Sequence, residues 1–349
     1  MTAVASAALS MSPPVRRRLV VGVASFGALL IVSCLVAPLV GSTSISLRRA
    51  LDPALPFADN VDAQIFFIAR LPRVLAAVVV GASLAAAGVV FQALLRNPLA
   101  TPFTLGVSAG ASLGAMLAVT SGVALAIGGV SAVPLASFAG SLAAVAVVYA
   151  LASARHRGFS TSVMLLAGVT MNAFFSALIL FVQYFADATQ TLRTIRWLMG
   201  DLDIASYAPL LASLPLLCLA LLVFAWLPRS LNLLSLGRDQ AEARGVDVVR
   251  AQRLAFFSAS LATGAAVSLG GPIGFIGIIV PHLVRLLVGS VHRVVLPCAL
   301  LFGGAFLVAC DLIARTVLAP IELPVGIVTA VIGGPFFLWL LVRRAGGRP

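Results

Sequence analysis

The chain has 349 residues and a formal net charge of +12, and its composition is 61% hydrophobic but only 10% charged. All 23 basic residues are arginine, and the absence of lysine excludes a P-loop, whose lysine contacts the nucleotide phosphates. Any ATP-driven work therefore requires hydrolysis by another chain. Nucleic-acid binding is not indicated, because membrane orientation signals account for the arginines.

About ten apolar runs succeed one another along the chain, each roughly 17–25 residues long, which as a helix crosses a bilayer core of about 30 Å. We therefore predict an all-α membrane protein with about ten transmembrane helices. The predicted spans are 19–41, 74–95, 103–121, 130–152, 162–185, 207–227, 253–269, 273–289, 294–318 and 324–342. One membrane domain, residues 19–342, then lies between tails at 1–18 and 343–349.

The first span follows Arg16, Arg17 and Arg18 and is longer than the apolar core of 7–15 residues that marks a secretory signal. It predicts an uncleaved helix. The third span contains Gly106, Gly110 and Gly114, and small residues at this spacing favour close helix packing.

The arginines are distributed unequally when the ten spans are threaded through a membrane. Sixteen fall on the side of the two termini and seven on the other side, whereas the acidic residues divide three to eight. Cytoplasmic loops carry the excess of basic residues in membrane proteins. Both termini are therefore predicted to be cytoplasmic.

Arginines at the opposite side need an explanation, since that side disfavours them. Arg70-Leu71-Pro72-Arg73 lies at the mouth of the second span, where Pro72 suits a first helical turn and the two arginines share a face. They either snorkel at the interface or present two exposed guanidinium groups to the carboxylates of a soluble partner. Arg315 follows Asp311 by four residues, so it is either paired structurally or a third docking residue.

The long polar insertion 228–252 is predicted to lie on the cytoplasmic side. Gly237 and Gly245 bracket one or two helical turns, which predicts a short helix, a turn and a second short helix. The insertion is either a solvated connection or a coupling element that fits a cleft on a cytoplasmic motor.

Polar and helix-breaking residues gather at several predicted membrane boundaries. Asn97-Pro98-Leu99 follows the second span, and Thr161 and Ser162 open the fifth. Capping and kinking explain many such residues, and gating is the functional alternative. The cysteines and histidines show no metal-ligand spacing, so no metal site is predicted. They are Cys34, Cys218, Cys298, Cys310, His156, His282 and His292.

Several strings between residues 65 and 342 together resemble the FecCD-type permease family, the membrane subunits of ABC importers for iron-siderophores, haem and vitamin B12. Their joint order and spacing carry the resemblance. The strings are Arg70-Leu71-Pro72-Arg73, Gly81 to Gln92, Asn97-Pro98-Leu99-Ala100, Leu105-Gly106-Val107-Ser108, Leu165-Leu166-Ala167-Gly168, Trp197-Leu198-Met199-Gly200, Gly274-Phe275-Ile276-Gly277, Pro281-His282 and Glu322-Leu323-Pro324-Val325-Gly326.

The resemblance implies a multi-pass permease of the bacterial inner membrane that has no catalytic site and binds no cofactor or metal. It implies a homodimer whose path is lined largely by residues 162–185 and 324–342 of each chain. Two cytoplasmic ATPase subunits, which hold the ATP and Mg, and a periplasmic binding protein complete the implied assembly.

The resemblance also assigns roles to individual residues. Docking of the binding protein falls to Arg70, Arg73 and Arg315. The cytoplasmic gate falls to Thr161 and Ser162, with Asn97 and Leu99 as a second contact. Coupling to the ATPase falls to Gly237, Arg238, Asp239, Ala241, Glu242, Arg244 and Gly245.

The expected cargo is an iron chelate, haem or a ferric siderophore, with cobalamin as the alternative, an order that reflects frequency in the family. An ion-coupled carrier would need buried titratable groups near mid-membrane, but Asp311 and Glu322 lie near the outer face. An intramembrane enzyme would need catalytic residues, such as a Ser/His pair, two carboxylates or an HExxH motif, at the same depth in the membrane. The sequence contains no such arrangement. ATPase activity that depends on a partner chain would separate the importer from both.

Overall fold

The computed structural model describes residues 12–123, 125–153, 161–204 and 206–346, and these residues are mainly helical. Seven of the described helical segments are long and apolar enough to cross a membrane, and three shorter apolar helices accompany them. Each of these ten corresponds to one predicted span. The prediction of an all-α membrane protein is therefore confirmed.

The ten apolar helices account for most of the chain. They are α2 (Pro13–Val36), α5 (Leu71–Leu94), α6 (Val107–Ser121), α7 (Ala132–Ser153), α8 (Thr161–Tyr184), α10 (Ala208–Trp226), α13 (Val248–Gly270), α14 (Ile276–Val288), α15 (His292–Thr316) and α16 (Val325–Gly346). The connections contain α3 (Leu47–Ala50), α4 (Val61–Gln64), the π-helix η1 (Ile65–Arg70), the 3-10 helix η2 (Pro102–Leu105), α9 (Ala188–Leu198), α11 (Pro228–Leu234), α12 (Arg238–Ala243) and the antiparallel strands β1 (Ala126–Ile127) and β2 (Val130–Ser131).

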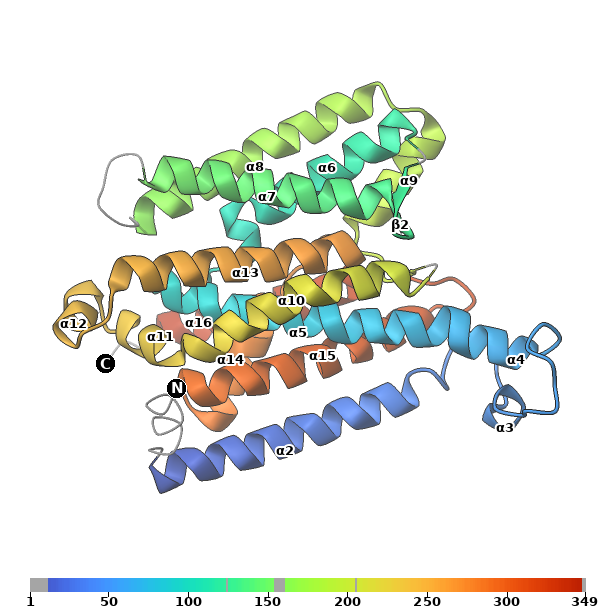
Figure 1. The fold of residues 1–349 in the computed structure, drawn as a ribbon, viewed down its shortest axis with the longest axis horizontal. Coiled ribbons are helices and arrows are strands. Elements are labelled where there is room, and N and C mark those ends of the chain that lie inside the picture. Colours follow the sequence, from blue (N-terminus) through green and yellow to red (C-terminus); the bar gives the residue numbers. More distant parts are fainter. Residues whose placement is uncertain (1–11, 124, 154–160, 205, 347–349) are drawn as a thin grey trace.

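Helix α5 is the centre of the bundle, and most of its residues are buried because α13, α14 and α15 pack around it. Helices α6 to α9 form a separate layer on one side, and α2 lies outermost on the other side, against α15 (Figure 1). The start of α2 lies beside α11, because Ser12 and Val15 line one pocket together with Arg229 and Asn232. Helix α12 lies at the same end of the bundle, which we call the terminal end (Figure 1). Helices α3, α4 and α9 lie at the opposite end (Figure 1).

Two glycine contacts set the close packing around α5. A Cβ atom at Gly81 would lie 2.2 Å from the carbonyl oxygen of Gly303 on α15. A Cβ atom at Gly88 would lie 2.3 Å from the carbonyl oxygen of Gly277 on α14. Backbones that approach this closely exclude any side chain, as is common between helices in membranes.

The glycines of the third predicted span have two different roles. Gly110 and Gly114 contact α7, where their Cβ atoms would lie 2.6 Å and 2.0 Å from carbonyl oxygens, so the packing prediction holds for them. Gly106 instead has a φ of +74° and joins η2 to α6. The prediction of one helix over 103–121 is therefore wrong, because the left-handed backbone at Gly106 interrupts it.

Two helices begin before the predicted membrane spans. Helix α2 starts at Pro13, so Arg16, Arg17 and Arg18 lie in its first turns, ahead of the predicted span. Helix α13 starts at Val248, where the Asp247 carboxylate caps it by accepting the N–H of Arg250. Apolar windows miss such starts because the first turns of these helices contain arginines, and the cap of α13 is polar.

Candidate functional site

Five charged side chains gather at the end of the bundle opposite the terminal end, and we call them the arginine cluster: Arg70, Arg73, Asp311, Arg315 and Glu322. Arg73 donates from Nε to Asp311 Oδ1 at 2.9 Å and from Nη1 to Glu322 Oε2 at 2.6 Å. Arg315 Nε lies 3.0 Å from Asp311 Oδ2 as an ion pair that lacks hydrogen-bond geometry. The cluster thus joins α5, α15 and the connection before α16.

The backbone that follows α2 closes over the cluster. Arg70 donates from Nη1 to the carbonyl oxygen of Pro38 at 3.0 Å and also donates to that of Thr43. Arg315 donates from Nη2 to the carbonyl oxygen of Ala37 at 3.2 Å. Guanidinium groups therefore satisfy backbone carbonyls of the segment that follows α2.

The expectation that Arg70 and Arg73 present exposed guanidinium groups is wrong. Only 6% of Arg70, 8% of Arg73 and 3% of Arg315 is exposed. Residues Val61–Leu94 form one continuous helical segment, so the first two arginines lie within it rather than at its mouth. The predicted pairing of Arg315 with Asp311 is confirmed by their 3.0 Å separation.

The cluster contains three guanidinium groups and two carboxylates. Asp311 is buried, whereas 43% of the Glu322 side chain is exposed. Among the residues that the structure describes, Arg70 has carbonyl partners and no carboxylate. Buried charges are tolerated when they are paired, and this cluster contains one more guanidinium group than carboxylates.

The insertion at the terminal end folds as the sequence predicts. Helix α11 precedes α12, and Gly237 and Gly245, with φ of +122° and +76°, bracket α12. Ala241 is fully buried and packs with Leu234 and Val248. One face of α12 is therefore anchored to the bundle.

The opposite face of α12 is polar and accessible. Arg238 donates from Nε to Glu242 Oε1 at 2.8 Å, and both side chains are nearly half exposed. Asp239 and Arg244 are also exposed. This face presents charges of both signs to whatever lies beyond the terminal end.

The residues assigned to the gate lie in two separate segments. The Asn97 side chain accepts the N–H of Leu99 at 2.9 Å, which shapes the turn after α5. Ser162 is exposed near the start of α8, and Thr161 begins that helix, although its side chain lies outside the described residues. Within the described part of the chain, no hydrogen bond joins Asn97 to Ser162.

A cleft of about 360 Å³ with several polar residues in a mainly apolar lining opens between α6 and α8. Its lining includes Ser108 and Ser112 from α6, which are buried, and Asn172, Ser176 and Gln183 from α8. Our sequence interpretation missed these residues as a group. The signal was present, because positions 172, 176 and 183 fall on one face of a helix.

Apolar helices around α5, an open cleft with polar lining residues, and charged elements at both ends are typical of a polytopic membrane transport protein. Residues 29–343 match the model of the FecCD transport family, and the chain belongs to this family. It is the permease of an ABC importer, which implies ATPase partners and a membrane setting.

Two relatives and one solved structure illustrate the match. The chain is 44% identical over 276 residues to the cobalamin import system permease BtuC of Halobacterium salinarum, covering 79% of this chain and 72% of that one. It is 37% identical over 317 residues to the hemin transport system permease HmuU of Yersinia pestis, covering 90% and 93%. An inward-facing conformation of a putative metal-chelate type ABC transporter matches with a TM-score of 0.81 and 31% identity, covering 92% and 98%.

Proposed function

We propose that this permease moves an iron chelate, haem or a ferric siderophore, from the periplasm to the cytoplasm of a bacterium by alternating access. The observation that carries the proposal is the TM-score of 0.81 with a metal-chelate type transporter over 98% of that chain. The haem permease that matches along most of its length supports the same cargo class. Cobalamin is the second candidate, because a cobalamin permease is 44% identical.

The proposed path runs between two copies of the chain and is lined by α8 and α16. Support comes from α8, most of which is exposed although it is apolar, and which carries exposed Asn172 and Ser176. Polar side chains within a membrane face a protein interior or a water-filled cavity rather than lipid. A second copy facing α8 would supply that environment, with Thr161, Ser162, Asn97 and Leu99 proposed at the cytoplasmic gate.

The proposed contact with the ATPase is the exposed face of α12, which holds Arg238, Asp239, Glu242 and Arg244. The packing of α12 supports this proposal, because buried Ala241 fixes α12 to α11 and α13. A movement of α12 would therefore be transmitted to α13. ATP and Mg belong to the partner chain in this proposal, and the permease itself holds no cofactor.

The proposed docking site for a periplasmic binding protein is the arginine cluster, in which Arg70 has carbonyl partners but no carboxylate partner among the described residues. Its support is the excess of guanidinium groups over carboxylates. Replacing Arg70 with glutamine should weaken binding-protein affinity about tenfold or more, the typical effect of losing a hydrogen bond to a charged group. Titration in nanodiscs would measure it, with R49Q as the control, and unchanged affinity for R70Q would refute docking at Arg70.

Reconstitution tests the function directly. Liposomes would contain the chain with its candidate ATPase and binding protein, and uptake of haem, a ferric siderophore and cobalamin would be followed side by side. ATP-dependent uptake of haem or the siderophore would support the proposal. Uptake of cobalamin alone would show that cobalamin, and not an iron chelate, is the cargo. Failure to form a complex with any ATPase would contradict the assembly.

A further inference from the structure

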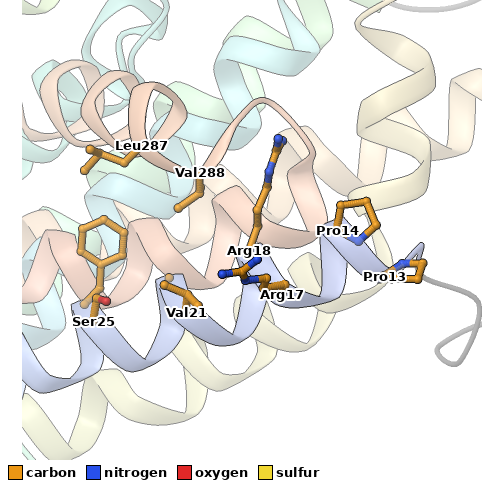
Figure 2. Close-up of a pocket in the computed structure, with 10 residues that line it drawn as sticks. Pro13, Pro14, Arg17, Arg18, Val21, Ser25, Leu287 and Val288 are labelled. Atoms are coloured by element: carbon orange, nitrogen blue, oxygen red, sulfur yellow. The ribbon is translucent and has the colours of Figure 1, made fainter.

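A groove of about 830 Å³ lies between the start of α2 and the end of α14. Its apolar lining includes Val21 and Phe26 of α2 and Leu287 and Val288 of α14. Figure 2 shows the side chains of α2 facing those of α14 across this space. The groove extends along α2 from Pro13 to Phe26, which is about 20 Å at the rise of an α-helix.

Helix α2 touches the bundle within the groove, and one end of the groove is basic. At Gly22 a Cβ atom would lie 2.8 Å from Cys298 Sγ and 3.1 Å from Val288 Cγ1, so α2 touches the bundle there. Towards the start of α2, Arg17 and Arg18 line the groove and are exposed. Arg18 extends towards α14, because a Cβ atom at Gly289 would lie 3.2 Å from its Nη1 atom.

No carboxylate of the described chain pairs with these two arginines. Each wall also comes from a stretch of sequence without aspartate or glutamate, namely residues 1–51 and 248–310. Simple snorkelling explains why arginines lie at a membrane boundary, but it does not explain an apolar groove that leads directly from them. An apolar groove with a basic mouth matches a molecule with an anionic head and an apolar tail.

We propose that this groove binds an anionic phospholipid, with its phosphate between Arg17 and Arg18 and an acyl chain against Val21, Phe26 and Val288. Helix α2 is largely exposed and lies at the periphery of the bundle, so bilayer lipid has direct access to it (Figure 1). Basic pockets between membrane helices are known to bind anionic head groups. The inference needs only the membrane setting of the family, and it does not depend on the proposed cargo.

Native mass spectrometry of the full chain would test the site. The protein would be taken from vesicles containing equal amounts of phosphatidylglycerol and phosphatidylcholine, and the ratio of the two bound lipids would be measured. We expect wild-type protein to retain phosphatidylglycerol, and R17Q and R18Q each to lower its retention about fivefold. The matched control is R16Q, which removes the same charge from the same turn without touching the groove.

A second pair of variants tests the apolar part without changing charge. Val21→Trp fills the groove and should displace the lipid, whereas Val20→Trp, on an exposed position outside the lining, should not. Equal retention by R16Q, R17Q and R18Q would overturn the proposal. So would displacement by millimolar inorganic phosphate, which would indicate a soluble anion, or displacement by the ATPase, which would indicate a protein interface.

Discussion

The arginine cluster and the pair Arg17 and Arg18 place the same residue type in opposite environments at the two ends of the bundle. In the cluster, Arg73 and Arg315 are buried and lie within 3.0 Å of carboxylate oxygens. Arg17 and Arg18 are exposed and border a groove without acidic residues. Arginine at the end opposite the terminal end is thus held by partners within the fold, while Arg17 and Arg18 at the terminal end have no carboxylate partner among the described residues.

The largest expected effect comes from removing the central residue of the cluster. Arg73→Gln leaves buried Asp311 without its hydrogen-bonded partner, and breaking a buried pair in this way typically costs about 3–5 kcal/mol. Unfolding in detergent micelles, followed as a shift in melting temperature, would measure the loss. The control is R49Q, whose exposed guanidinium lies 3.7 Å from Asp62. Equal melting temperatures of R73Q and R49Q would show that the buried ion pair contributes no more stability than the exposed one.

A double-mutant cycle on Asp311 and Arg315 comes next. Contacting charges usually couple by about 0.5–3 kcal/mol, so D311N and R315Q together should destabilise the chain less than the sum of the two single changes. The same unfolding assay provides the three values. Strict additivity would mean that the 3.0 Å ion pair contributes nothing.

Glu322→Gln should have a smaller effect, about 1 kcal/mol or less, because 43% of the Glu322 side chain is exposed to solvent and ions screen it. The loss should shrink further at high salt, whereas that of R73Q should not. A salt series of melting temperatures would show this. A loss of stability in E322Q that does not depend on salt would show that Glu322 behaves like the buried charges of the cluster.

The smallest effect on stability is expected at the terminal end. Arg238→Gln breaks an exposed pair with Glu242 at spacing i,i+4, which is typically worth about 0.3–0.5 kcal/mol. Its effect should instead appear as reduced transport per ATP hydrolysed, since α12 is the proposed ATPase contact. Q240A, on the same short helix, is the control, and unchanged coupling in R238Q would argue against a role for that side chain.

Much of the fold follows from local sequence. The apolar runs predict the ten helices, and Gly237 and Gly245 bracket α12 because only glycine readily adopts their positive φ. Helix α9 was missed because it is short and amphipathic, although Asp187 and Gln190 form a capping box that marks its start.

The arginine cluster could not be predicted in the same way. Arg73 meets Asp311 across 238 residues and Glu322 across 249, and no local pattern specifies such pairings. The burial of Arg70 likewise depends on the backbone carbonyls of Pro38 and Thr43. Backbone partners of this kind cannot be recognised from residue type. The sequence did indicate that arginines on the side predicted to disfavour them required a structural or functional explanation.

The distance along the chain between these partners has a consequence for biosynthesis. Arg315 contacts the carbonyl of Ala37, which is made 278 residues earlier. At about 5–20 residues per second, the Ala37 carbonyl remains without this guanidinium partner for roughly 14–56 s after its own synthesis. Arg73 lacks Asp311 over a similar interval, so their buried ion pair can form only after the ninth apolar helix has been synthesised.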